Sequence, residues 1–305
     1  MPAELDAALG ALEPVIGRPE SAPVPLEGGI TNRNFRLRIG GRDVVVRLPG
    51  KDTERLGIDR AAERAATERA AAAGVGPEVV AFLAAPPCLV TRFLPGRPVT
   101  AAELRAPALL AEAAAALRAV HAAPALPSRF DAFAIVEAYR ATAAAAGTRI
   151  PPGYGELIAG AQAIQAALVG PEHAPVACHN DLLTANFLHD GARLWIVDWE
   201  YAGMGDRYFD LGNLSVNNGF AEEDDERLLA AYWDAPCTPA RFAALRLMRV
   251  MSDFREGMWG VVQTAISALD FDFVAYAAQH LERVAAGLAD ARFPTWLEAA
   301  RGDRT

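Results

Sequence analysis

The chain is poor in lysine and cysteine. Lys51 is the single lysine among 29 basic residues, and the formal net charge is −9. A nucleic-acid partner needs clustered basic side chains for the phosphate backbone, so this charge balance argues against one. Three cysteines, Cys88, Cys178 and Cys237, are too few and too scattered for a disulfide framework or a zinc site. We therefore expect a protein of the cytoplasm.

Long apolar runs are also missing. No run of about 18 apolar residues occurs, so we expect no membrane insertion. The opening MPAELDAALG has neither the basic region nor the apolar core of a signal peptide. The Gly-x-x-x-x-Gly-Lys-Ser/Thr motif is absent, which excludes the P-loop nucleotide-binding proteins. What the chain does have is 305 residues, 52% of them apolar, enough for two lobes around a cleft.

The first part of the chain has the pattern of a small β-rich lobe. Apolar residues alternate with arginines at 35–39, and Gly40-Gly41 then offers a tight turn, which predicts a hairpin. Pro95-Gly96 breaks the chain, and we place the lobe boundary there, with lobes at 1–95 and 96–305. The elements expected in the first lobe are strands at 35–39, 44–48, 79–83 and 89–94 and a helix at 58–73 that ends at Gly74.

The second lobe is predicted to be mainly helical. Thr100 and Glu103 form a capping box before a long Ala/Leu helix that ends near His121. Between residues 175 and 198 the pattern returns to short strands around a polar loop. Further helices are expected at 131–146, 154–168, 206–217, 223–233, 239–268 and 272–288. This order predicts an α+β fold of two lobes, but the motifs decide its function.

The strongest motif lies between residues 178 and 200. Asp181 stands five residues before Asn186 in a loop between two strands, and Asp198 ends an apolar strand twelve residues later. Phosphoryl transfer needs one carboxylate at the acceptor hydroxyl, and an amide and a second carboxylate that hold Mg²⁺ against the ATP phosphates. Mg²⁺ prefers hard oxygen ligands and keeps several waters, so one Asn and one Asp can suffice. The alternative is an ordinary hairpin, in whose turns Asn and Asp are common.

A family resemblance rests on this segment. HNDLLTANFL at 179–188, followed by DWEYAGMGDRYFDLGN at 198–213, resembles the choline/ethanolamine kinases, relatives of the aminoglycoside phosphotransferases with a protein-kinase-like fold. The resemblance spans about residues 26–280. It implies that Asp181 is the catalytic base and that Asn186, Asp198 and Glu200 form the metal site.

Three neighbouring polar residues are expected to have supporting roles. Asp210 and Asn213 match later positions of the family's second motif. We expect both to anchor the helix start and the loop behind the metal site. We expect His179 to brace the loop rather than to titrate in catalysis.

The nucleotide is expected to bind at the turn between the first two strands. In LEGGITNRNF at 26–35, the glycines let backbone N–H groups approach phosphates, and the polar side chains add hydrogen bonds. A plain hairpin turn explains the glycines equally well, but the stretch resembles the Gly-Gly-x-Ser/Thr-Asn loop of choline kinases. The candidate residues are Gly28, Gly29, Thr31, Asn32 and Asn34.

Arg47 stands on the strand where protein kinases carry a phosphate-binding lysine. Choline kinases have Arg-Leu at this place, and a guanidinium can bind phosphate in a bidentate way. Glu63 on the following helix is the expected partner of Arg47, with Glu68 as the alternative. The segment TRFL at 91–94 resembles the hinge of the family, where backbone groups of Arg92 and Leu94 would bind adenine.

The acceptor pocket is predicted around the helix at 239–268. Asp253, Glu256 and Trp259 lie near one face of it, and Tyr276 follows on the next helix. The segment resembles the choline-pocket helices of choline kinases, whose aromatic cage binds a quaternary ammonium. Two positions depart from the eukaryotic pattern: Glu256 replaces a second tryptophan, and Asn217 replaces a glutamate. The alternative is that Trp259 and Tyr276 are ordinary core aromatics.

The resemblance therefore implies an ATP- and Mg²⁺-dependent phosphotransferase that acts on a small cationic alcohol. Choline is the first expectation and ethanolamine the second. A kinase for another hydroxylated cation, such as thiamine or an aminoglycoside, stays open because the pocket and not the fold decides the substrate. A pseudokinase that acts as a regulator is a further alternative, against which the complete set of Asp181, Asn186 and Asp198 argues.

Overall fold

A computed structural model describes residues 2–26, 31–51, 53–171, 173–267, 269–302 and 304. The chain divides into two compact units. Unit 1 comprises Met1–Val99 and Ala185–Tyr201, and unit 2 comprises Thr100–Thr184 and Ala202–Thr305. Unit 1 holds an antiparallel sheet and unit 2 is mainly helical, which confirms the predicted α+β class. The lobe boundary between residues 95 and 96 stays a prediction.

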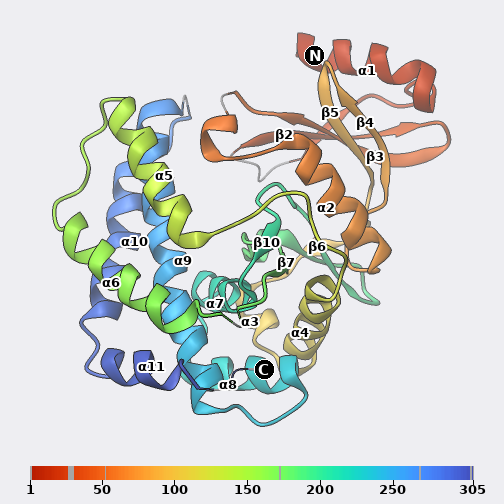
Figure 1. Cartoon of the computed structure of the whole chain (residues 1–305). Coiled ribbons are helices and arrows are strands. Elements are labelled where there is room, and N and C mark those ends of the chain that lie inside the picture. The colour runs from red at the N-terminus through yellow and green to blue at the C-terminus, as the bar shows by residue number, and fades with distance from the viewer. Residues whose placement is uncertain are drawn as a thin grey trace. The chain divides into compact units, whose positions relative to one another are not determined.

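Unit 1 is built on a five-stranded antiparallel sheet in the order β1-β2-β3-β5-β4 (Figure 1). Its main elements are α1 Ala3–Ile16, β1 Val24–Leu26, β2 Asn32–Ile39, β3 Arg42–Pro49, α2 Arg60–Ala72, β4 Val79–Ala84 and β5 Pro87–Arg92, with a 3₁₀ turn at Thr53–Leu56. The predicted hairpin is confirmed, with Phe35 opposite Val46. Gly40 and Gly41 have φ of 56° and 75°, the left-handed backbone that a two-residue hairpin turn requires.

Helix α1 completes the core of this unit and was not predicted. Leu5, Leu9 and Leu12 are buried together with strand residues such as Leu37 and Val44. Their spacing of four and three residues is the apolar stripe of an amphipathic helix. This apolar stripe was present in the sequence, so helix α1 could have been predicted from it.

A second, smaller sheet in unit 1 lies beside the predicted metal residues Asn186 and Asp198 in the sequence. It has the strand order β6-β8-β9, with β6 at Arg97–Pro98, β8 at Phe187–His189 and β9 at Leu194–Ile196. A 3₁₀ turn at Thr184–Asn186 leads into β8. The Ile196 N–H donates to the Val75 carbonyl (2.7 Å), and the Val197 N–H donates to the Asn186 carbonyl (2.9 Å). The second bond fixes Asn186 beside the residue that precedes Asp198.

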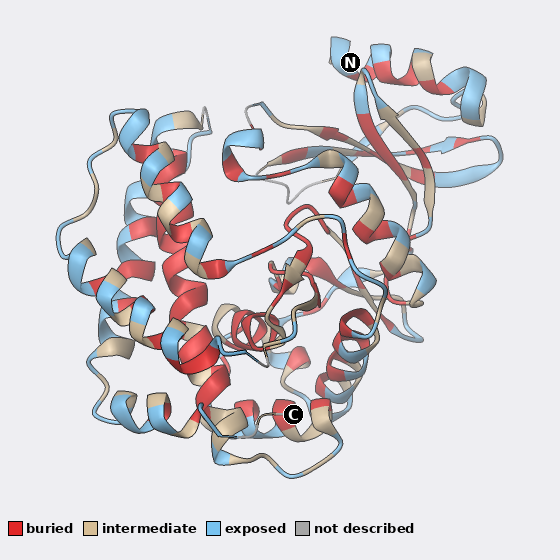
Figure 2. Cartoon of the chain, in the orientation of Figure 1, coloured by how far each residue is buried: buried red, intermediate tan, exposed pale blue. Residues whose placement is uncertain are grey.

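Unit 2 is organised around one long buried helix. Its elements are α3 Ala101–Leu104, α4 Pro107–His121, α5 Ala132–Ala145, α6 Tyr154–Leu168, β7 Val176–Cys178, β10 Gly203–Gly205, α7 Arg207–Asn217, α8 Glu222–Trp233, α9 Pro239–Ile266, α10 Phe273–Leu288 and α11 Phe293–Ala299. Every residue from Val250 to Gln263 of α9 is buried (Figure 2). Helices α5, α7 and α10 pack against it. A helix buried on all sides forms the core of its domain.

One predicted helix was wrong in its extent. Thr100 and Glu103 do form a capping box, with the Thr100 N–H 2.8 Å from the Glu103 carboxylate. However, α3 ends at Leu104, and α4 begins anew at Pro107. Proline lacks the N–H that a helix interior needs and disfavours helical backbone at the preceding residue, so it starts a helix. Among the described residues, no helix combines the length and apolarity that crossing a bilayer requires.

Candidate functional site

A pocket of about 350 Å³ lies within unit 1. Apolar side chains such as Val45, Leu89 and Val197 line it together with polar groups, which is the usual make-up of a small-molecule site. Six of the predicted site residues meet there: Asn34, Arg47, Arg92, Leu94, Asn186 and Asp198. The structure thus brings together predicted residues that are up to 164 positions apart, from Asn34 to Asp198. Gly28 and Gly29 lie outside the described residues.

Arg47 is the charged centre of this pocket. Its Nη1 lies 2.8 Å from Glu63 Oε1 and 2.5 Å from Asp198 Oδ1, and its Nε donates to Asn34 Oδ1 at 3.2 Å. The predicted pair with Glu63 is therefore confirmed, and Glu68 pairs with another arginine at the surface. Burial alone would lower the pKa of Arg47, but the charges of Asp198 and Glu63 outweigh it and raise the pKa above its ordinary value. Arg47 is a permanent cation, suited to bind phosphate.

Glu200 is buried in a network of its own. Its Oε2 accepts from Asn32 Nδ2 (2.8 Å) and from Arg60 Nη1 (3.1 Å), and its Oε1 accepts from the Thr31 hydroxyl. Burial and the charge of Asp198 raise the pKa of Glu200. Its metal role stays a prediction, since in this structure it fastens residues 31 and 32. Arg60, which also contacts Glu63, was not among the predicted residues; its place three residues before Glu63 on α2 was the available signal.

Asn186 and Asp198 offer the hard oxygen donors that Mg²⁺ prefers. Both line the pocket of unit 1. Asp198 has φ of 70°, a left-handed backbone that is uncommon outside glycine and concentrates at functional sites. One carboxylate and one amide oxygen at the same pocket fit a magnesium ion that keeps several of its waters.

In the predicted hinge at residues 91–94, two backbone groups already form hydrogen bonds. The Arg92 N–H donates to the Glu78 carbonyl (2.8 Å), and the Leu94 carbonyl accepts from the Gly96 N–H (2.8 Å). Adenine binding by Arg92 would therefore have to use its carbonyl. Adenine binding by backbone groups of Arg92 and Leu94 stays a prediction.

In unit 2, buried side chains hold the loop that carries Asp181. Asp210 accepts from the N–H groups of His179 (2.8 Å) and Asn180 (2.7 Å), and Asn213 Oδ1 accepts from the Leu182 N–H (2.5 Å). His179 Nδ1 accepts from the Asp181 N–H (3.1 Å). The predicted supports of the loop are confirmed.

The start of helix α7 is not anchored by the residues predicted for it. Asp206, and neither Asp210 nor Asn213, caps α7 by accepting from the Tyr208 N–H at 2.8 Å. That part of the prediction was wrong. Asp210 lies within the first turn of α7, where its carboxylate is turned to the catalytic loop.

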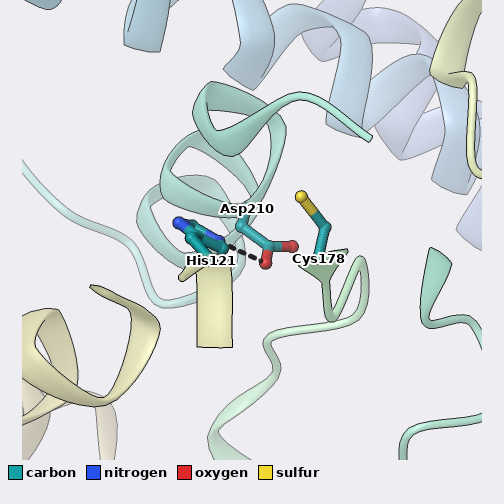
Figure 3. A group of neighbouring side chains, drawn as sticks. All are labelled: His121, Cys178 and Asp210. Atoms are coloured by element: carbon teal, nitrogen blue, oxygen red, sulfur yellow. Dashed lines mark hydrogen bonds and ion pairs between the residues drawn. The ribbon is translucent and has the colours of Figure 1, made fainter. Parts of the chain in front are cut away.

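His121, Cys178 and Asp210 form a buried cluster with the composition of a metal site (Figure 3). Both ring nitrogens of His121 are already engaged, Nδ1 with the Tyr232 hydroxyl (2.7 Å) and Nε2 with Asp210 Oδ2 (3.0 Å). Burial raises the pKa of the Cys178 thiol well above its usual value, and a protonated thiol is a poor metal ligand. The cluster supports the catalytic loop through Asp210.

The predicted acceptor residues of α9 and α10 are close together. Tyr276 donates its hydroxyl to Glu256 Oε2 at 2.8 Å. The rings of Trp259 and Tyr276 meet edge to face with 5.7 Å between their centroids, and Phe273 lies 5.8 Å from Trp259. Burial and the charge of Glu256 raise the pKa of Tyr276. Aromatic rings and a buried carboxylate therefore share one place in unit 2.

Two other predicted acceptor residues have different surroundings. Asp253 Oδ1 lies 2.9 Å from His280 Nδ1 and accepts from Arg283 Nε at 2.9 Å, so its charge is already compensated. Asn217 ends α7, and its side-chain nitrogen is buried with no hydrogen-bond partner among the described residues. Acceptor binding by both stays a prediction.

Arg255 is the functional candidate that sequence reasoning missed. It is only 1% exposed, its Nη1 lies 3.6 Å from Asp181 Oδ1, and the same nitrogen donates to Glu256 Oε1. The Tyr139 hydroxyl is a further neighbour of this arginine. No signal along the sequence pointed to it, because an arginine in a helix is exposed in most proteins.

Comparisons with known proteins agree with this geometry. The model of the phosphotransferase enzyme family, APH, matches residues 23–248. A choline/ethanolamine kinase family protein from Mesorhizobium loti is 33% identical, and the alignment covers 98% of this chain and 99% of that one with a TM-score of 0.84.

More distant relatives are similar to parts of the chain or to its fold. Ethanolamine kinase 2 of Mus musculus is 30% identical over 122 residues, which are 33% of this chain and 32% of that protein. The alignment thus spans about a third of this curated relative. Choline kinase LicA of Streptococcus pneumoniae has the same fold, with 21% identity, a TM-score of 0.78 and coverage of 93% of this chain and 98% of that one. The chain belongs to the phosphotransferase enzyme family and, within it, to the choline/ethanolamine kinase family.

Proposed function

We propose that this protein transfers the γ-phosphoryl group of ATP to the hydroxyl of a small amino alcohol, choline or ethanolamine. One observation carries the proposal. In unit 2, the carboxylate of Asp181 lies beside Arg255, and Arg255 contacts Glu256 in the predicted acceptor pocket. A base next to a pocket of aromatic rings and one carboxylate suits an alcohol that carries a positive charge.

Asp181 acts on the acceptor. Its carboxylate accepts or orients the proton of the substrate hydroxyl while the oxygen attacks the γ-phosphorus. The backbone bonds from His179, Asn180 and Leu182 hold the loop in one conformation, so the carboxylate needs little reorganisation.

The pocket of unit 1 takes the nucleotide. Its apolar walls suit a base, and Arg47 suits the phosphates because its guanidinium is charged at any working pH. LicA, which has the fold of this chain, has been solved in complex with AMP. Binding of phosphate to Arg47 would compete with its contacts to Glu63 and Asp198.

Asn186 and Asp198 would hold Mg²⁺. When bound, the ion would neutralise negative charge on the transferring phosphoryl group. Arg47 Nη1 lies 2.5 Å from Asp198 Oδ1. The carboxylate of Asp198 could therefore hold the ion only if Arg47 is shared between this carboxylate and the phosphates.

The acceptor is recognised by its charge. Glu256 uses Oε1 for Arg255 and Oε2 for Tyr276, so the carboxylate is fixed rather than free to turn toward a ligand. A quaternary ammonium would gain from the faces of Trp259 and Tyr276, and a primary ammonium would gain from a hydrogen bond to the remaining lone pairs of Glu256. This arrangement supports choline first and ethanolamine second.

A coupled assay of ADP release tests the proposal. The purified protein is given ATP and Mg²⁺ with choline, ethanolamine, thiamine or an aminoglycoside, and Asp181→Asn serves as the inactive control. We expect turnover with choline and ethanolamine and none with the control. Turnover with thiamine or an aminoglycoside alone would replace the proposed acceptor, and ATP binding without turnover of any of the four would favour a pseudokinase.

A further inference from the structure

Arg255 is an unusually costly residue for the interior of unit 2. Its side chain is among the largest that are fully buried, at 1% exposure, in the middle of α9. Removing a guanidinium from water costs several kcal/mol, which only well-placed carboxylates and hydrogen bonds can offset. An arginine in such a place is therefore explained by what it contacts.

The same nitrogen of Arg255 contacts two carboxylates. Nη1 lies 3.6 Å from Asp181 Oδ1 and donates to Glu256 Oε1. The side chains of Asp181 and Glu256 are themselves only 15% and 5% exposed. Two largely buried carboxylates that share one site repel each other, and this repulsion is poorly screened away from water. A cation between them removes this conflict.

The remaining titratable neighbours leave this charge balance to the three residues. From α5, burial raises the pKa of Tyr139 to about 12, and from α10 burial raises the pKa of Tyr276 as well, so both phenols stay neutral. His179 meets Asp181 through the backbone N–H of that residue. The nearby group of Asp253, His280 and Arg283 is paired within itself.

We propose that Arg255 is a positioning residue that holds the carboxylates of Asp181 and Glu256 in one ion-paired group, so that the acceptor pocket carries one net negative charge and takes a monocation. This inference rests on the proposed function, which places both acids at the acceptor. Two carboxylates and one guanidinium sum to a charge of −1, which one ammonium group neutralises. Without Arg255, the repulsion between the two carboxylates would no longer be offset, and the base and the charge that attracts the acceptor would no longer be held together.

The test is the pH profile of kcat/KM for choline, compared among charge variants. An opposite charge at this distance lowers a carboxyl pKa by about 1–3 units. Arg255→Met should therefore move the acid limb of the profile to higher pH by about one unit or more. Glu256→Gln should move it to lower pH, because Arg255 then acts on Asp181 alone. The double variant should lie between the two, and Arg255→Lys should restore most of the wild-type profile.

A matched control comes from the same helix. Arg246 pairs with the buried Asp225, its Nη1 3.1 Å from Oδ2, and its other carboxylate neighbour is Glu222. Arg246→Met should leave the acid limb in place. Calorimetric ATP binding shows for each variant that unit 1 is intact.

The outcomes separate the two proposals. If the wild-type protein turns over neither choline nor ethanolamine, the proposed function fails. If the wild type is active and the acid limb coincides in wild type, Arg255→Met and Glu256→Gln, the inference about Arg255 is overturned while the function stands. If Arg255→Met does not fold, Glu256→Gln and Arg255→Lys decide: the first must lower the acid limb and the second must keep it.

Discussion

Tyr276 donates its hydroxyl to Oε2 of Glu256 at 2.8 Å, and this bond joins α10 to α9. It fixes the Tyr276 ring at the edge of Trp259, with 5.7 Å between the ring centroids. The two aromatic residues and the carboxylate therefore respond to mutation as one group, and the effects of single changes need not add.

Trp259→Leu should lower kcat/KM for choline by about tenfold, since a desolvated cation–π contact contributes about 0.5–2 kcal/mol. The loss for ethanolamine should be no larger, because a primary ammonium can still use Glu256. Trp296→Leu is the control, since Trp296 is equally buried, at 6% exposure, but belongs to α11. Steady-state kinetics with both acceptors give the comparison, and equal losses in both tryptophan variants would mean that Trp259 only supports the fold.

Asp181→Asn should abolish transfer and leave ATP affinity nearly unchanged. The carboxylate acts on the acceptor hydroxyl, whereas the nucleotide candidates lie in the pocket of unit 1. Single-turnover kinetics measure the first effect and calorimetry the second. A variant with more than about a tenth of the wild-type kcat would remove Asp181 from its role as base.

Most of the fold and the chemically active motif were predictable from sequence because both have local signals. The hairpin around Gly40 and the helix that ends at Gly74 follow from turn chemistry and periodicity. Asp181, Asn186 and Asp198 stood out by their spacing, and the family resemblance implied their roles, which stay predictions. The break at Pro107 was readable too, but the alanine-rich helix pattern on both sides concealed it.

The contacts of Arg60 with Glu200 and of Arg255 with Asp181 were not predictable in the same way. An arginine in a helix is exposed in most proteins, and nothing in its neighbours along the chain shows that α9 is buried on all sides. Which carboxylate such an arginine meets depends on tertiary packing. The sequence predicted Glu256 for the acceptor pocket but did not reveal the guanidinium that contacts it.

Asp210→Asn should lower kcat strongly without a change in ATP affinity. Asp210 accepts three hydrogen bonds, from His179 N–H, Asn180 N–H and His121 Nε2, and an amide replaces one acceptor oxygen by a donor. The buried mismatch should also cost about 1–3 kcal/mol of the free energy of unfolding. Tyr208→Phe is the control, because it removes a hydroxyl bond of the same helix that does not reach the loop. Denaturant titration and kinetics together test this, and an unchanged kcat in a destabilised Asp210→Asn would limit Asp210 to the fold.

The three cysteines should differ in reactivity. Burial raises the pKa of all three thiols, but Cys88 and Cys178 are buried whereas Cys237 is partly exposed. A thiol reagent at pH 8 should therefore label Cys237 slowly and the other two only on unfolding, since the thiolate is the reactive form. Mass spectrometry of the labelled peptides identifies the site. Rapid labelling of Cys178 in the native protein would show that the cluster of His121, Cys178 and Asp210 opens readily.

Asp198→Ala should abolish the tightening of ATP binding by Mg²⁺, and Asn186→Ala should weaken it. The carboxylate is the stronger ligand for a hard cation, and the amide oxygen adds a neutral donor.

Asp198→Ala also releases Arg47 from its contact at 2.5 Å, so ATP binding without Mg²⁺ should become tighter in this variant than in the wild type. Asn186→Ala leaves that ion pair in place and lacks this second effect. Calorimetric titration of ATP with and without Mg²⁺ distinguishes the two variants. A full Mg²⁺ effect in both would rule out these residues as the metal site, and weaker metal-free binding in Asp198→Ala would show that Asp198 orients Arg47 for phosphate rather than competing with it.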